Sequence, residues 1–124
     1  MTAAPVILLV DDSRVSRMLC GAIVRERRPD AILVEAGNGD EALSCIATLV
    51  PHLAVLDVNM PGMNGLELAE RIRNDHPDMR IALLTANVQD SVRQRAAALN
   101  AAFFAKPIND TVVGRILDLL ESHP

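Results

Sequence analysis

The chain has 124 residues, of which 50% are hydrophobic and 2% aromatic, and this length fits one compact domain rather than two. Its 12 basic and 16 acidic residues give a formal charge of −4, so it lacks the clustered basic face that direct binding of nucleic acid requires. No leader-like N-terminus and no apolar segment of the ~20 residues that span a bilayer are seen, so we expect a cytoplasmic protein outside the membrane.

Five short apolar runs recur along the chain and are continuous rather than alternating. This pattern is typical of strands that are covered on both faces, as in a parallel sheet. Segments with apolar residues at helical spacing lie between the runs. Strict alternation of strands and helices predicts a (βα)5 domain, a doubly wound parallel α/β sheet with helices on both faces. The runs are residues 6–10, 31–34, 53–56, 81–84 and 101–105.

Each intervening helix is expected to bury an apolar stripe against the sheet. Asn38 with Glu41, and Asn64 with Glu67, have the spacing of a capping box, so the second and third helices should start just after these asparagines. Residues 88–99 carry the weakest stripe and predict the least firmly packed helix. In chain order, the expected stripes are Val15, Met18, Leu19, Ala22 and Ile23; Leu43, Ile46, Ala47 and Val50; Leu66, Ala69 and Ile72; Val92, Ala96 and Leu99; and Val113, Ile116, Leu117 and Leu120.

Polar residues follow four of the five apolar runs. Asp11 and Asp12 follow the first run, Asp57 the third, Thr85 the fourth and Lys106 the fifth. Because the carboxyl ends of parallel strands meet at one edge of a sheet, we expect these side chains to lie close together. Three carboxylates held close repel one another and favour a hard divalent cation with oxygen ligands, of which Mg²⁺ is the first candidate.

Taken singly, each of these positions also fits an ordinary polar strand end, and Asp12 or Ser13 could simply cap the following helix. Lys106 is the only lysine beside eleven arginines, and its compact ammonium group can approach a carboxylate or phosphoryl oxygen in a narrow pocket. The chain has no glycine-rich phosphate loop and no serine or cysteine nucleophile elbow. Asp57 remains as the candidate nucleophile.

Four motifs, at residues 10–13 (VDDS), 56–65 (LDVNMPGMNG), 84–86 (LTA) and 105–108 (AKPI), resemble the receiver domain of two-component response regulators. The resemblance covers nearly the whole chain. In its extent, the chain is similar to the single-domain chemotaxis response regulator. It implies a flavodoxin-like fold with strand order 2-1-3-4-5, formed by residues 1–124 as a single receiver domain.

The resemblance also implies the chemistry of the site. Asp57 would accept a phosphoryl group from a sensor histidine kinase or a histidine phosphotransfer protein. Asp12, Asp57 and the backbone carbonyl of Asn59 would hold Mg²⁺, and Asp11 would act largely through a bound water. The protein would then be a signalling switch rather than an enzyme, since it would catalyse only its own phosphorylation and dephosphorylation.

The same resemblance assigns a switch to the fourth and fifth strands. Lys106 would pair first with the acceptor carboxylate and then with a phosphoryl oxygen, while the Thr85 hydroxyl would bond another oxygen and move toward it. The bond between Lys106 and Pro107 would be cis. Phe103 occupies the aromatic switch position, where tyrosine is common, and without a hydroxyl its burial should be favoured. A downstream protein would bind the face formed by the fourth helix, fifth strand and fifth helix.

Two other functions stay open. An aspartate-dependent phosphatase or phosphotransferase of the haloacid-dehalogenase type also uses an acidic nucleophile on a parallel sheet, but it requires a second Asp where this chain has Asn59, and it usually carries a cap insertion. A non-phosphorylated interaction module could use the same scaffold. The presence of Asp12, Asp57, Thr85 and Lys106 together argues against it.

Overall fold

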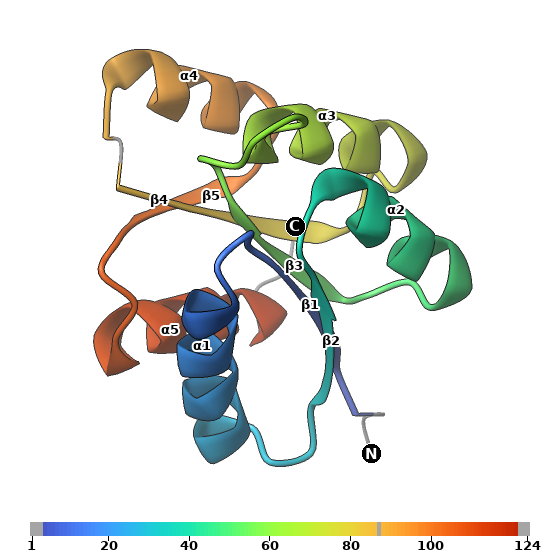
Figure 1. Cartoon of the computed structure of the whole chain (residues 1–124), viewed down its shortest axis with the longest axis vertical. Helices are drawn as coiled ribbons and strands as arrows, with labels where there is room; N and C mark the ends of the chain where they lie inside the picture. The colour runs from blue at the N-terminus through green and yellow to red at the C-terminus, as the bar shows by residue number, and fades with distance from the viewer. Residues whose placement is uncertain (1–3, 87, 122–124) are drawn as a thin grey trace.

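The computed structural model describes residues 4–86 and 88–121, in which strands and helices alternate strictly along the chain (Figure 1). The strands are β1 (Val6–Val10), β2 (Ile32–Ala36), β3 (Leu53–Asp57), β4 (Arg80–Thr85) and β5 (Ala102–Ala105). The helices are α1 (Arg14–Arg27), α2 (Gly39–Thr48), α3 (Gly65–Asp75), α4 (Asp90–Ala98) and α5 (Asp110–Leu117), followed by a short 3-10 turn, Asp118–Glu121. Within these ranges, no helix has the length and apolar character needed to cross a membrane.

The strands form one parallel sheet in the order β2-β1-β3-β4-β5, as predicted. Figure 1 shows α1 and α5 on one face of this sheet and α2, α3 and α4 on the other. Successive residues of a strand point to opposite faces, so Ile7 and Leu9 pack with α1 and α5, whereas Leu8 and Val10 pack on the other side. Every residue of β1 and β3 is buried, which explains why β1 is continuously apolar and β3 is apolar up to Asp57.

The predicted helix starts after Asn38 and Asn64 are confirmed. Asn64 accepts a hydrogen bond from the Glu67 N–H at 2.9 Å, and the Glu67 carboxylate accepts one from the Asn64 N–H at 3.1 Å, which completes a capping box. Asn38 caps α2 through the Glu41 N–H, but the Glu41 carboxylate accepts instead from the N–H of Gly37. Asn38 therefore caps α2 without the reciprocal bond from Glu41 that would complete a capping box.

The buried face predicted for α1 is wrong. Val15 is 75% exposed and Met18 60% exposed, whereas Cys20, Gly21 and Val24 are buried against the sheet. Both sets of residues have helical spacing, so periodicity alone could not decide which one faces inward. The face that packs is made of small side chains, and this leaves the larger apolar residues of α1 in solvent.

The other helices follow their predicted stripes more closely. In α3 all the predicted residues are buried, whereas in the last stripe Leu120 lies beyond the end of α5 and is only half-buried. In α2, Ala42 and Ile46 are buried, but Ala47 is exposed and Val50 lies beyond the end of the helix. The residues buried in α3 and α5 are Gly65, Leu66, Leu68, Ala69, Ile72, Val113, Ile116 and Leu117.

The helix α4 buries the fewest residues of the five helices. Of its residues only Val92 and Ala96 are buried, and the side chain of its N-cap residue, Gln89, makes no capping hydrogen bond. It is also shorter than the predicted segment of residues 88–99. An element with few buried apolar residues can move at low cost in free energy.

Candidate functional site

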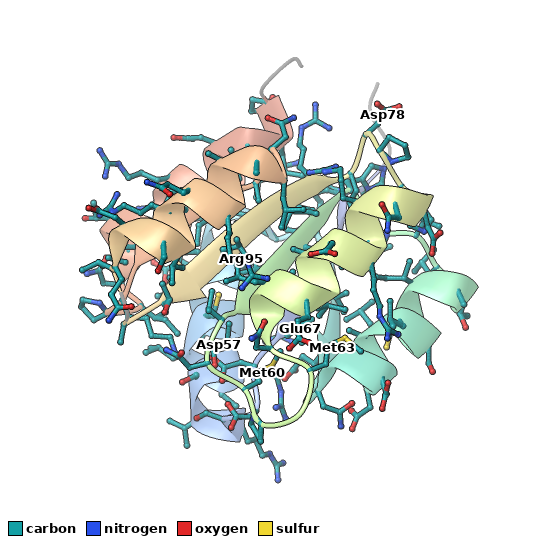
Figure 2. The ribbon with its side chains drawn as sticks, turned by 90° about the horizontal axis from the view of Figure 1, so that it is seen from above. Asp57, Met60, Met63, Glu67, Asp78 and Arg95 are labelled. Atoms are coloured by element: carbon teal, nitrogen blue, oxygen red, sulfur yellow. The ribbon has the colours of Figure 1, made fainter. Side chains whose placement is uncertain are left out.

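The carboxyl edge of the sheet brings together the polar residues that follow the strands. Asp11 directly follows β1, Asp57 ends β3, Thr85 ends β4 and Lys106 directly follows β5. The backbone N–H of Lys106 donates to the Thr85 carbonyl at 2.9 Å, which fixes the two strand ends side by side. Figure 2 shows Asp57 at this end of the molecule, while Asp78 lies at the opposite end.

Three carboxylates converge at this edge. Asp11, Asp12 and Asp57 each offer one oxygen, and these atoms all lie within 4.8 Å of one another. Asp11 and Asp57 are buried, while Asp12 is exposed. The Oδ1 atom of Asp57 is buried and has no hydrogen-bond partner among the described residues, and such an atom normally has one. An all-oxygen donor set around an unsatisfied carboxylate atom fits a small hard cation such as Mg²⁺.

Lys106 contributes the positive charge at the site. Its Nζ atom lies 3.3 Å from Oδ1 of Asp57 and 3.6 Å from Oδ2 of Asp11. These are ion-pair distances, and the contact with Asp57 lacks the geometry of a hydrogen bond. The peptide bond between Lys106 and Pro107 is cis, as expected.

The electrostatics of Asp57 reflect its surroundings. Burial raises the pKa of the Asp57 carboxyl, and the neighbouring charge of Asp11 raises it further. Lys106 and the backbone N–H of Asn59 act in the opposite direction on this pKa but do not reverse it. The Lys106 ammonium group thus lies at ion-pair distance from two of the three carboxylates, those of Asp11 and Asp57.

Thr85 lies deepest at this edge, with 0% of its surface exposed. Its hydroxyl oxygen accepts a hydrogen bond of 3.2 Å from the Nδ2 atom of Asn59. This contact of the Asn59 side chain with Thr85 was not predicted from the sequence. A short amide side chain two residues after the nucleophile was the available signal, but it does not by itself identify the partner.

Phe103 and Phe104 point to opposite faces of the sheet. Phe103 is half-buried and packs with the core on the side of α2, α3 and α4, whereas Phe104 packs on the side of α1 and α5. The guanidinium carbon of Arg93 in α4 lies 4.8 Å from the centre of the Phe103 ring, a cation-π contact. Phe103 therefore connects β5 to the loosely packed helix.

Comparison with known proteins identifies the family. A family model of the response regulator receiver domain matches residues 7–117. The chain belongs to this family. It is therefore a receiver domain of two-component signalling, with the CheY-like fold that its strand order shows. This membership favours the receiver function over a haloacid-dehalogenase type of phosphatase.

Several relatives share 30% identity or more with the chain. A protein-glutamate methylesterase/protein-glutamine glutaminase of Geobacillus kaustophilus is 32% identical over 130 residues, covering 94% of this chain and 37% of that protein. Response regulator MprA of Mycolicibacterium vanbaalenii is 42% identical over 96 residues, covering 77% of this chain and 39% of that protein. The chain thus spans less than half the length of each.

Solved structures of receiver proteins match over almost their full length. Chemotaxis protein CheY4 of Vibrio cholerae superposes with a TM-score of 0.86 at 26% identity, covering 95% of this chain and 99% of that one. Response regulator TrrA of Thermotoga maritima, solved in complex with Mg²⁺-BeF, has a TM-score of 0.81 at 32% identity, with coverages of 93% and 98%.

Proposed function

We propose that residues 1–124 act in the cytoplasm as one phosphoacceptor domain, which receives a phosphoryl group on Asp57 from a sensor histidine kinase or a histidine phosphotransfer protein. The observation that carries this proposal is the environment of Asp57. Its carboxylate is buried and faces Lys106 at 3.3 Å, and its Oδ1 atom lacks a hydrogen bond in the described part of the chain. A carboxylate that is withdrawn from water and only partly balanced by a neighbouring ammonium group is a suitable nucleophile.

The proposed transfer is an in-line displacement at phosphorus. An Asp57 oxygen forms the new P–O bond while the P–N bond to the donor histidine breaks, and the imidazole leaves with the electron pair of that bond. Lys106 is placed to stabilise the negative charge on the phosphoryl oxygens, because its Nζ already lies beside the attacking carboxylate.

The acidic residues fit a Mg²⁺ ion. Asp12, Asp57 and the backbone carbonyl of Asn59 would hold it, and Asp11 would act through a bound water. When bound, Mg²⁺ supplies positive charge against the phosphoryl oxygens and the carboxylates. The closeness of the three carboxylate oxygens, only two of which have a partner in Lys106, supports this assignment.

The donor protein is proposed to dock on α1. Val15, Met18 and Leu19 are 75%, 60% and 47% exposed and form an apolar stripe at helical spacing. The stripe begins next to Asp11 and Asp12, so a protein that covers it can reach Asp57. A helical partner fits best, because an apolar ridge of this spacing packs into the grooves of another helix.

The signal is proposed to leave through the surface of α4, β5 and α5. A turn of the Thr85 hydroxyl toward a phosphoryl oxygen is proposed to weaken the hydrogen bond that it accepts from the amide of Asn59. The strand that ends at Thr85 leads toward the start of α4, and Phe103 and Arg93 join that helix to β5. A downstream protein would recognise the rearranged surface.

Titration with beryllofluoride and Mg²⁺ tests the proposed function, with backbone amide signals followed by NMR. We expect the signals of residues 88–99 and of β5 to shift in the wild type and to stay unchanged in Asp57→Asn. Equal shifts in both proteins, or no shift in the wild type, would contradict the proposal.

A further inference from the structure

Arg17 occupies the first position of the α1 face that packs against the sheet. It precedes Cys20, Gly21 and Val24 at helical spacing, and these three residues are buried. The Arg17 side chain is itself only 17% exposed. A guanidinium group that is largely withdrawn from water needs acceptors, because an unpaired buried charge is costly.

Two hydrogen bonds of different kinds hold the Arg17 guanidinium. Its Nη1 atom donates to the backbone carbonyl of Asp11 at 2.6 Å, and its Nε atom donates to Oε1 of Glu35 at 3.0 Å. Asp11 directly follows β1, and Glu35 lies in β2. Arg17 thus links the peptide group of Asp11, at the end of β1, to helix α1 and to the neighbouring strand β2.

Asp11 is restrained on several sides. Its N–H donates to the Ala36 carbonyl at 3.2 Å, its own carbonyl accepts from Arg17, and its Oδ1 atom accepts from the N–H of Ser13 at 2.8 Å. The Oδ2 atom then faces Lys106 at 3.6 Å. The bond from Arg17 is the one that crosses from a side chain on α1 to the peptide group between the two acidic residues.

We propose that Arg17 is a positioning residue for the cluster of carboxylates formed by Asp11, Asp12 and Asp57. Its hydrogen bond holds the peptide group of Asp11 so that the carboxylates of Asp11 and Asp12 converge beside Asp57. This inference rests on the proposed function, because the convergence serves the binding of a divalent cation. Mg²⁺ demands nearly ideal octahedral geometry, so small displacements of its ligands or of their waters weaken it.

A purely electrostatic role of Arg17 would have the opposite consequence. Removal of a positive charge near a cluster of carboxylates strengthens their attraction for another cation, so Mg²⁺ would bind more tightly. Loss of a positioning bond makes Mg²⁺ bind more weakly. The sign of the change in Mg²⁺ affinity therefore separates the two roles.

The test is a titration of the full chain with Mg²⁺ alone, followed by the amide signals of the loop after β1. Residues that orient metal ligands from outside typically change affinity about 10–100-fold, and we expect a loss of this size in Arg17→Ala. Arg17→Lys keeps the charge but can reach only one of the two acceptors, so its affinity should lie between those of Arg17→Ala and the wild type. Arg14→Ala removes the same charge from an exposed position of α1 and should leave the affinity unchanged or slightly higher.

Wild-type or tighter Mg²⁺ binding in Arg17→Ala overturns the inference. Thermal unfolding of the same samples shows whether each variant is folded. If Arg17→Ala does not fold, Arg17→Lys carries the test, and wild-type affinity in that variant overturns the inference. A wild-type chain that fails to bind Mg²⁺ contradicts the proposed function together with this inference, whereas an unaffected Arg17 variant beside a binding wild type contradicts the inference alone.

Discussion

The side-chain amide of Asn59 donates a hydrogen bond of 3.2 Å to the hydroxyl of Thr85. The two residues follow and end neighbouring strands, β3 and β4, at the edge where Asp57 lies. Since the Thr85 hydroxyl is proposed to turn toward a phosphoryl group, the bond from Asn59 opposes that movement and stabilises the arrangement seen without a phosphoryl group.

Replacement of Asn59 by leucine tests this opposition. Asn59→Leu has a similar volume but no donor, so Thr85 should turn more easily and the signals of α4 should shift part of the way toward their beryllofluoride-bound positions. The expected gain is about 1 kcal/mol, the net contribution of one hydrogen bond. NMR of the protein without ligand measures the shift. Asn74→Leu, at an exposed site on α3, is the control, and equal spectra of wild type and Asn59→Leu would speak against the opposition.

The raised pKa of Asp57 predicts how stability depends on pH in the absence of metal. The folded protein binds this proton more tightly than the unfolded chain does, so ionisation of Asp57 costs stability as pH rises from about 3.9, the unfolded value, through the folded pKa. Below both values the cost is absent. Asp57→Asn should therefore be more stable than the wild type at neutral pH, by a margin that shrinks in acid.

Urea unfolding with a chelator present, from neutral to acidic pH, measures this margin. Asp75→Asn is the control, because Asp75 is exposed at the end of α3. If the margin between Asp57→Asn and the wild type is the same at every pH, the buried charge of Asp57 is not its cause.

Arg73 is predicted to anchor the end of α4. Its guanidinium group donates to backbone carbonyls in two loops, one after α3 and one after α4. Loss of these charge-assisted bonds leaves several carbonyls without partners, so Arg73→Ala should lower the free energy of unfolding by about 2–4 kcal/mol. The acceptors are the carbonyls of His76, Pro77, Met79, Leu99 and Asn100.

Urea unfolding of Arg73→Ala beside Arg71→Ala checks this prediction. Arg71 lies on the same helix but is exposed, and its loss should cost about 0.5 kcal/mol or less. Equal effects of the two substitutions would show that the bonds of Arg73 contribute little.

Lys106→Arg is expected to separate phosphorylation from its structural consequence. The charge remains, so Asp57 should still take up a phosphoryl group with Mg²⁺, but the wide planar guanidinium cannot replace an ammonium group in a tight site. The signals of residues 88–99 should then shift less than in the wild type. Phosphate uptake and amide shifts are both followed by NMR after addition of a small phosphodonor. Full wild-type shifts in the variant would show that Lys106 does not couple phosphorylation to the movement of residues 88–99.

The strands and their order could be predicted because burial on both faces leaves a plain signal, an apolar run that ends in a polar residue. Because these polar residues follow parallel strands, Asp11, Asp57, Thr85 and Lys106 could also be predicted to lie at one edge of the sheet, where the structure places them. Their chemical roles remain proposals.

Three features were beyond this reasoning. In α1, two sets of residues have helical spacing, and the burial of Cys20, Gly21 and Val24 together with the bonds of Arg17 shows which face lies against the sheet. The acceptors of Arg73 are backbone carbonyls, which leave no trace in the sequence. The contact between Asn59 and Thr85 joins the loop after β3 to the last residue of β4, and the distance between them is set by the sheet register.

Mass spectrometry of the intact chain after incubation with a small phosphodonor tests the central claim most directly. With Mg²⁺ present, the wild type is predicted to gain one phosphoryl group, while Asp57→Asn and the wild type with a chelator gain none. Equal uptake by Asp57→Asn, or no uptake by the wild type with Mg²⁺, would contradict the account of Asp57 as the phosphoacceptor.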